Sequence, residues 1–243
     1  MPLVRTAAIL PVKRFALAKQ RLGESVADPL RLELARAMVG DVLSALRDCA
    51  AVERTIVVTC EESVAAAARY LGAIVVPDRA EAGQSAAVTQ GIERAIAEGF
   101  ARVLCIPGDC PALDPGEVDA LLGDESGGPA EVVIVPDRHG TGTNGLLLTP
   151  ARAIAPSFGP GSCARHARLA GEAGVACRIE ALPSLLLDID TGDDLATLRK
   201  RLAETGTDSG DTRAAAARAG GLQSRARRTR TVLGISPRAT RAA

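Results

Sequence analysis

The chain has 243 residues with 29 basic and 29 acidic side chains, and 47% of its residues are hydrophobic although only 2% are aromatic. This length and composition indicate one large domain with a core of Ala, Val, Leu and Ile, as in α/β proteins whose Ala-rich helices cover buried strands. Eight arginines and two aspartates lie from Gly206 onward, which leaves 21 basic against 27 acidic side chains before it and argues against general nucleic-acid binding.

Strand patterns alternate with helix patterns through the first half of the sequence. The apolar positions of residues 30–46 recur at helical spacing, as is typical of a helix with one buried face. In chain order, the predicted elements are a strand over 7–12, a helix over 30–46, a strand over 55–59, a helix over 62–71, a strand over 73–76, a helix over 84–99 and a strand over 102–106. Such alternation implies right-handed crossovers and a mainly parallel sheet.

The pattern changes beyond residue 107. Strands are predicted over 131–135 and 145–148, close enough to pair without a long helix between them, so an antiparallel addition to the sheet is expected. Helices are predicted over 161–174 and 193–203. The sequence therefore predicts an α/β three-layer sandwich with a mixed, mainly parallel sheet over 1–205. An Arg-rich tail over 206–243 is expected to be disordered, because it cannot bury enough apolar surface to offset its chain entropy.

The compartment is predicted from what the sequence lacks. It has no apolar run approaching about 18 residues, and no basic segment followed by a long apolar run near its start, which argues against a membrane partner. Its six cysteines are scattered without a C-x-x-C pair, so they are read as reduced thiols and not as a zinc site. A cytoplasmic protein is expected, and the chain is compatible with a homodimer.

Ligand sites in open α/β sheets lie beyond the carboxyl ends of the strands. The first loop in such a position follows strand 7–12 and carries four cations within nine residues, namely Lys13, Arg14, Lys19 and Arg21. These could neutralise a triphosphate, with the arginines giving bidentate contacts. The same residues are also compatible with an ordinary solvated surface.

Aspartates follow two further strand patterns. Gly108 permits a tight turn after strand 102–106, which leaves Asp109 pointing off the sheet as a magnesium ligand or as a helix cap. Asp188 and Asp190 lie two apart in a predicted strand over 185–191, so they would point at one site. Two like charges side by side are costly without a cation, which favours a metal site. Alternatively, Asp190 or Thr191 caps the following helix, which would account for one of the two aspartates.

The last candidate is the turn Phe-Gly-Pro-Gly-Ser at 158–162, which opens the helix predicted over 161–174. A turn of this kind presents backbone N–H groups and the positive end of the helix dipole to an anion. Arg165 and Arg168 lie in the first two turns, where positive charge opposes the dipole, and this favours a bound anion. His139 and His166 are, taken singly, more typical of surface or packing residues.

Taken together, these loops resemble the guanylyltransferases of deazaflavin coenzyme F-420 biosynthesis, which act on phosphoenolpyruvate, 2-phospho-L-lactate or 3-phospho-D-glycerate. The matching segments run in the family's order from residue 7 to about residue 202: 11–14, 18–22, 107–113, 137–143, 158–166 and 188–191. The tail lies outside the resemblance. One departure is Gln84-Ser85, where an asparagine is common in the family after an apolar residue.

The resemblance implies a nucleotide-diphospho-sugar transferase type of fold, with GTP as donor, Mg²⁺ as cofactor and pyrophosphate as leaving group. It also implies that the phosphorylated acid is bound by the residues matching a threonine, a glycine and a serine of the family. The resulting assignment is catalysis by Lys13, Arg14 and Asp109, nucleotide contacts by Lys13, Lys19, Arg21 and Gly108, metal binding by Asp109, Asp188 and Asp190, and acceptor binding by Thr143, Gly159 and Ser162.

The expected reaction transfers GMP from GTP to phosphoenolpyruvate and gives enolpyruvyl-diphospho-guanosine and pyrophosphate. The alternatives are the same reaction on 2-phospho-L-lactate or 3-phospho-D-glycerate, since each acid offers a phosphate beside a carboxylate. A molybdopterin-type or sugar-phosphate nucleotidyltransferase is disfavoured because the loop Gly-Gly-x-Ser-x-Arg-Met-Gly is missing. A non-catalytic nucleotide-binding scaffold, with a basic tail that recruits an acidic partner, is the alternative outside enzymes.

Overall fold

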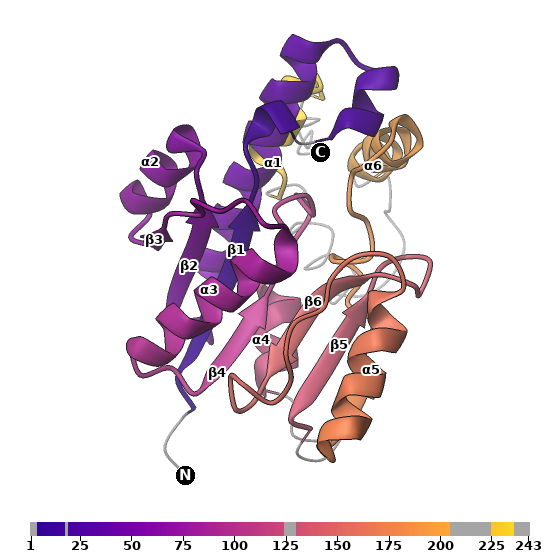
Figure 1. Cartoon of the computed structure of the whole chain (residues 1–243). Coiled ribbons are helices and arrows are strands. Elements are labelled where there is room, and N and C mark those ends of the chain that lie inside the picture. The colour runs from indigo at the N-terminus through magenta and orange to yellow at the C-terminus, as the bar shows by residue number, and fades with distance from the viewer. Residues whose placement is uncertain (1–3, 18, 124–129, 205–224, 236–243) are drawn as a thin grey trace, which may run out of the picture.

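The computed structural model describes residues 4–17, 19–123, 130–204 and 225–235. Within these ranges the strands form one seven-stranded sheet in the order β3-β2-β1-β4-β6-β5-β7 (Figure 1). The strands are β1 (Thr6–Val12), β2 (Arg54–Thr59), β3 (Ile74–Val76), β4 (Arg102–Cys105), β5 (Val132–Pro136), β6 (Thr143–Leu148) and β7 (Cys177–Ile179). Six of the seven are parallel to one another, and β6 runs antiparallel to both of its neighbours, β4 and β5.

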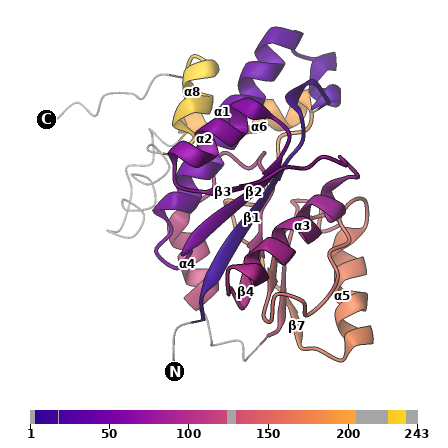
Figure 2. The same ribbon diagram turned by 60° about the vertical axis from the view of Figure 1, so that its left-hand side comes forward.

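Helices cover both faces of the sheet (Figure 2). One face packs against α1 (Asp28–Asp48), α2 (Glu62–Tyr70) and α4 (Pro115–Gly123), and the other against α3 (Gln84–Ala97) and α5 (Ser162–Ala173). The two buried clusters consist mainly of Ala, Val, Leu and Ile, which fits the low aromatic content. The predicted three-layer α/β sandwich with a mixed, mainly parallel sheet is therefore confirmed.

The direction of β6 determines which loops meet. The carboxyl ends of β1, β3 and β4 lie at one edge of the sheet, because these strands are parallel. Since β6 runs the opposite way, its first residues, Thr143 and Asn144, lie at the same edge. The loops after three strands and the start of a fourth thus converge where ligands bind in open α/β sheets.

The strand predicted over 185–191 is not formed. Leu185, Leu187 and Ile189 are buried, and they alternate with the less buried Leu186, Asp188 and Asp190, but the segment is a loop that begins with a turn and a bend. Its backbone bonds to a loop and not to a strand, because the Ile189 N–H donates to the Asp109 carbonyl at 3.1 Å. The alternation arises because one side of the loop packs on the core, which a single sequence does not distinguish from strand pairing.

The prediction of a disordered tail does not hold for residues 225–235, which include the helix α8 (Arg227–Val232) packed against α1. Asp41 of α1 accepts hydrogen bonds from the backbone N–H groups of Arg228 at 3.0 Å and Thr229 at 2.9 Å. Gly40 permits the close approach, because a Cβ atom there would lie 2.7 Å from Cδ of Arg228. Residues 206–224 and 236–243, also predicted to be disordered, lie outside the described residues.

A third buried cluster joins α8 to the edge that carries the loops. It contains residues of α1, of the short 3-10 helix η2 (Gln20–Glu24), of the loop before α6 (Gly192–Glu204) and of α6 itself. Its members are Leu22, Leu34, Met38, Leu187, Ile189, Leu195, Leu198, Leu202 and Ala226. None of the helices in the described ranges is long and apolar enough to cross a membrane.

Candidate active site

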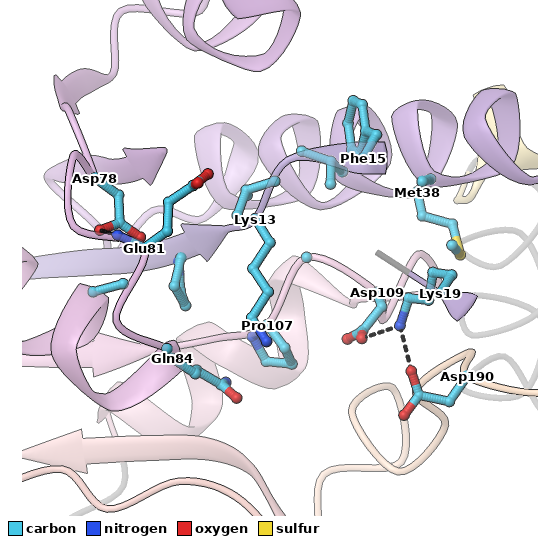
Figure 3. Close-up of a pocket in the computed structure, with 17 residues that line it drawn as sticks. Lys13, Phe15, Lys19, Met38, Asp78, Glu81, Gln84, Pro107, Asp109 and Asp190 are labelled. Atoms are coloured by element: carbon cyan, nitrogen blue, oxygen red, sulfur yellow. Dashed lines mark hydrogen bonds and ion pairs between the residues drawn. The ribbon is translucent and has the colours of Figure 1, made fainter. Parts of the chain in front are cut away.

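A cavity of about 460 Å³ opens at the edge where the strand ends converge. It is lined by the end of β1, by the loops after β3 and β4, by the first turn of α3 and by one face of α1 (Figure 3). The polar and glycine residues of its wall are Lys13, Lys19, Asp78, Glu81, Gly83, Gln84, Gly108, Asp109 and Asp190. Asp109, Lys19 and Asp190 lie at one end of the cavity, Asp78 and Glu81 lie at the other, and Lys13 lies between them (Figure 3).

Lys19 lies between two carboxylates. Its Nζ atom bonds to Asp109 and to Oδ1 of Asp190, the latter at 2.7 Å, and its side chain is only 10% exposed. Burial lowers the pKa of Lys19, but the charges of Asp109 and Asp190 outweigh it and raise the pKa above its ordinary value. Lys19 also has a φ of 56°, a left-handed conformation that is strained for a residue with a side chain. The surrounding structure therefore holds a charged ammonium group at this point.

Asp188 and Asp190 lie in two different environments. Burial raises the pKa of Asp188, and the charge of Asp109 adds to this rise, while a hydrogen bond from Asn144 Nδ2 at 3.2 Å opposes it. Burial also acts to raise the pKa of Asp190, but Lys19 outweighs it and lowers the pKa below its ordinary value. Of the two predicted helix caps, Thr191 supplies the contact, since its hydroxyl accepts from the Asp194 N–H at 3.3 Å.

One oxygen of this cluster has no hydrogen-bond partner among the described residues. It is Oδ1 of Asp109, which is buried, and a buried unpaired carboxylate oxygen is costly unless a cation or donor meets it. Within the described ranges no three acidic, cysteine or histidine side chains converge closely enough to hold an ion together. Asp109, Asp188 and Asp190 are nevertheless oxygen donors of the kind that hard divalent cations take, and the unpaired oxygen of Asp109 is suited to one.

The four predicted triphosphate ligands are placed differently from one another. Lys13 and Lys19 line the cavity. Arg14 and Arg21 are not among the residues that line it. Arg14 instead pairs with Glu81 of the wall at 2.7 Å, and Arg21 pairs with Oδ2 of Asp190, also of the wall, at 2.8 Å. Both arginine side chains are more than half exposed, so these ion pairs contribute little to stability and leave the guanidinium groups at the rim.

The predicted acceptor residues lie beside the cavity and not in its wall. Thr143 begins β6, next to Asn144, which contacts Asp188. Gly159 has a φ of 112°, which favours glycine, and lies in the turn before α5. This turn is joined to the first turn of α3, because the Phe158 N–H donates to Ser85 Oγ at 2.8 Å. Gly159 and Ser162 share this turn, and His166 joins the turn to Thr143.

Two backbone N–H groups of this turn, which the sequence predicts to face an anion, are already paired within the protein. The N–H of Ser162 already donates to the Gly159 carbonyl at 3.0 Å, and that of Cys163 donates to the Thr141 carbonyl at 3.1 Å. Arg165 donates to the carbonyl oxygens of the turn, including those of Ser157 at 2.8 Å and Pro160 at 2.9 Å. Arg165 thus holds the turn itself, so its basic charge in the first turn of α5 does not require an anion.

His166 is fully buried and connects Thr143 to this turn. Its Nδ1 atom lies 3.1 Å from Thr143 Oγ1, and its Nε2 atom accepts the Ser157 N–H at 2.8 Å. Its ring packs edge-on against Phe158, with centroids 5.1 Å apart. Burial, and to a lesser extent the charge of Arg165, lowers the pKa of His166 to about 4. The imidazole is therefore neutral at physiological pH.

A pH dependence of stability follows from this neutral histidine. The unfolded state binds a proton near the ordinary pKa of 6.5, whereas the folded state resists protonation down to a pKa of about 4. The free energy of unfolding should therefore fall as the pH drops from 7 to 4, by on the order of 3 kcal/mol from this group. The measurement is urea unfolding of the wild-type protein and of His166→Asn, each at pH 7 and at pH 4. The free energy of unfolding should drop less between these pH values in the variant. An equal drop in both proteins would contradict it.

The residues at the other end of the cavity were not among those predicted from the sequence. Asp78 follows β3 and is 6% exposed, and its Oδ1 accepts the Glu81 N–H at 3.1 Å. Glu81 has a φ of 45°, and Gln84 begins α3 in the same wall. The signal was available, because residues 73–76 were predicted as a strand and the same strand-end argument applies to the loop that follows it.

Solved structures of similar fold include nucleotide-diphospho-sugar transferases and nucleotidyltransferases. A Desulfovibrio desulfuricans G20 protein assigned to the nucleotide-diphospho-sugar transferases has a TM-score of 0.66 at 17% identity and covers 89% of this chain and 96% of its own. CMP:2-keto-3-deoxy-manno-octonic acid synthetase, solved with CTP, has a TM-score of 0.57 at 14% identity and covers 82% and 99%. At such low identity these likenesses show the fold alone.

Proteins similar in sequence show the family to which the chain belongs. A phosphoenolpyruvate guanylyltransferase of Conexibacter woesei is 52% identical over 198 residues, covering 82% of this chain and 89% of its own. A 2-phospho-L-lactate guanylyltransferase of Methanothermobacter thermautotrophicus is 34% identical over 195 residues, covering 80% and 84%. The profile of a family described as "Guanylyl transferase CofC like" matches residues 6–207. On this match and these identities, the chain belongs to the CofC-like family of guanylyl transferases.

Proposed function

We propose that this protein transfers the guanylyl group of GTP to phosphoenolpyruvate in coenzyme F-420 biosynthesis, giving enolpyruvyl-diphospho-guanosine and pyrophosphate. The observation that carries the proposal is the cavity at the strand ends, which has Asp109, Lys19 and Asp190 at one end and Lys13 beside them toward its middle. The 52% identity to a phosphoenolpyruvate guanylyltransferase supports the choice of acceptor. The proposal includes GTP as the nucleotide, Mg²⁺ as the cofactor and the cytoplasm as the compartment.

The two ends of the cavity suit the two ends of GTP. Lys13 and Lys19 supply positive charge for the triphosphate. At the opposite end, the Asp78 carboxylate can accept from the two adjacent donors of guanine, N1–H and the 2-amino group, which adenine, cytosine and uracil do not present together. The backbone of Asp78 is held on both sides, since its N–H donates to the Thr59 carbonyl and its carbonyl accepts from Cys60 Sγ. The carboxylate is thus preorganised.

The transfer needs no strong base. The phosphate of the acceptor has a second pKa of about 6 and is largely dianionic at neutral pH, so one of its oxygens attacks the α-phosphorus of GTP. The bond from that phosphorus to the bridging oxygen breaks, and pyrophosphate leaves with the electron pair. The protein's part is to align the two anions and to offset their charge. Lys13, Arg14 and Lys19 offset charge, and Thr143, Gly159 and Ser162 hold the acceptor.

Asp109, Asp188 and Asp190 would hold the divalent metal. A bound Mg²⁺ supplies further neutralisation of the triphosphate and of the leaving pyrophosphate. The unpaired buried oxygen of Asp109 is the feature of this chain that supports the assignment. Gly108 precedes this carboxylate in the cavity wall, where a Cβ atom would lie 3.0 Å from Cγ2 of Val39, and its backbone is the proposed nucleotide contact.

The test is an assay of pyrophosphate release by the purified full chain with GTP, Mg²⁺ and each of phosphoenolpyruvate, 2-phospho-L-lactate and 3-phospho-D-glycerate. The highest kcat/KM is expected for phosphoenolpyruvate, with ATP, CTP and UTP as poor donors. Absence of pyrophosphate with all three acids would refute the proposed function. A preference for 2-phospho-L-lactate would favour the second candidate, which the 34% identical archaeal relative supports.

A further inference from the structure

We propose that His166 is a positioning residue for the acceptor, which donates from Nδ1–H to Thr143 Oγ1 and so directs the hydroxyl proton of Thr143 toward the bound anion. This inference rests on the proposed function, because it takes Thr143 as an acceptor ligand. It assigns a role to a histidine whose residue type, taken alone, indicates only packing.

The tautomer follows from the two partners of the ring. A backbone N–H has only a proton to give, so Nε2, which receives the Ser157 N–H at 2.8 Å, must carry a lone pair. A neutral imidazole then bears its single proton on Nδ1. Nδ1 lies 3.1 Å from Thr143 Oγ1, so the histidine is the donor and the threonine oxygen is the acceptor.

This tautomer determines where the hydroxyl group of Thr143 can donate its proton. A hydroxyl group has one proton and two lone pairs, and His166 uses one of the lone pairs. The threonine cannot donate to this histidine, so its proton remains for another acceptor. A phosphate or carboxylate oxygen of the acceptor is a partner of that kind, and a hydrogen bond to an anion is stronger than one between neutral groups.

The surroundings keep the ring in this state and place. The side chain is fully buried, lies edge-on to Phe158 and connects the start of β6 with the turn before α5. Arg165, the charged neighbour of the ring, is bound by the carbonyl oxygens of the same turn. A protonated ring would lose the bond from Ser157, so the pairing selects the neutral form. His166 thus orders both segments that carry the proposed acceptor ligands.

Two variants separate the two nitrogen atoms. In His166→Asn the amide N–H group replaces Nδ1–H and can still donate to Thr143. In His166→Gln the longer side chain places its amide near the position of Nε2, so it can serve Ser157 but not Thr143. With the full-length enzyme, GTP and Mg²⁺, His166→Gln should raise the KM for phosphoenolpyruvate roughly 10- to 100-fold. His166→Asn should raise it less than about 5-fold, and the KM for GTP should stay unchanged in both.

A double-variant cycle distinguishes positioning from general loosening. Thr143→Val should raise the acceptor KM about as much as His166→Gln does, while Thr143→Ser should not. In the Thr143→Val background His166→Gln should add no more than about 2-fold, because its effect passes through the hydroxyl group. An equal rise in the KM for both substrates, or a full further loss in the Thr143→Val background, would overturn the proposal. So would an unchanged acceptor KM in a folded His166→Gln enzyme.

An independent readout needs no turnover. Long-range ¹H–¹⁵N spectra of the free enzyme at pH 7.5 report which imidazole nitrogen carries the proton. The chain has two histidines, so His166→Asn assigns the signals. The Nδ1–H tautomer is expected for His166, and the Nε2–H tautomer would overturn the proposal even in an enzyme that proved inactive. Inactivity of the wild-type protein with all three acids would instead refute the proposed function.

Discussion

Replacing Asp109 with asparagine is expected to lower kcat for pyrophosphate release roughly a thousandfold, which corresponds to about 4 kcal/mol of transition-state stabilisation. The change keeps the side chain's size but removes the charge that faces Lys19 and the proposed metal. The oxygen without a hydrogen-bond partner among the described residues, Oδ1, is the one expected to meet a cation. The measurement is steady-state kinetics with GTP and phosphoenolpyruvate over a range of Mg²⁺ concentrations.

The matched control is Asp193→Asn, which neutralises an exposed carboxylate in the first turn of α6. It should keep the wild-type kcat. A thermal unfolding curve shows whether Asp109→Asn is folded, which is expected because Lys19 keeps its bond to Asp190. Wild-type turnover by the folded Asp109→Asn protein would remove Asp109 from the catalytic assignment.

Deleting residues 225–243 is expected to reduce the free energy of unfolding by about 2 to 4 kcal/mol, because the deletion exposes the buried cluster on which α8 rests. It also leaves the Asp41 carboxylate, which is 6% exposed, without the two N–H donors of α8. The same cluster contains Leu22, Leu187 and Ile189, which flank Lys19 and Asp190 in the chain. Turnover should therefore fall together with stability. Urea unfolding and the pyrophosphate assay measure the two effects.

Asp41→Asn tests the contact within the intact chain, since an amide can accept only one of the two N–H groups well. Its cost should be smaller than that of the deletion, and Asp48→Asn, at the exposed end of α1, should cost almost nothing. An unchanged urea midpoint for the deleted protein would show that α8 contributes nothing to the domain.

Much of the fold could be predicted because its signals are local. The helical spacing of apolar residues in 30–46 corresponds to α1, and the β-branched runs correspond to β2 and β5. Period and residue type depend on neighbours along the chain, which one sequence contains. The segment 185–191 was misassigned as a strand for the same reason. Its alternation of buried and less buried residues is a strand signal, although no strand in the described part of the chain pairs with it.

The helix α8 could not be predicted in the same way. It has only six residues, too few for a sustained apolar period, and an isolated helix of that length is unstable. Its stability comes from Asp41 and Gly40, which lie nearly 190 residues earlier. The composition of the segment does not reveal the surface of α1 that receives it.

The sequence by itself determined the candidate carboxylates and the basic loop, because a residue that follows a strand pattern is placed at the end of that strand wherever the strand lies in the sheet. Only the tertiary structure decided their partners. Lys19 lies between Asp109 and Asp190, Arg14 pairs with Glu81, and His166 meets Thr143, across separations of 90, 171, 67 and 23 residues. Such pairings depend on the order and the direction of the strands in the sheet, above all on the reversed β6. Neither the order nor the direction can be derived from the local periodicity of apolar residues.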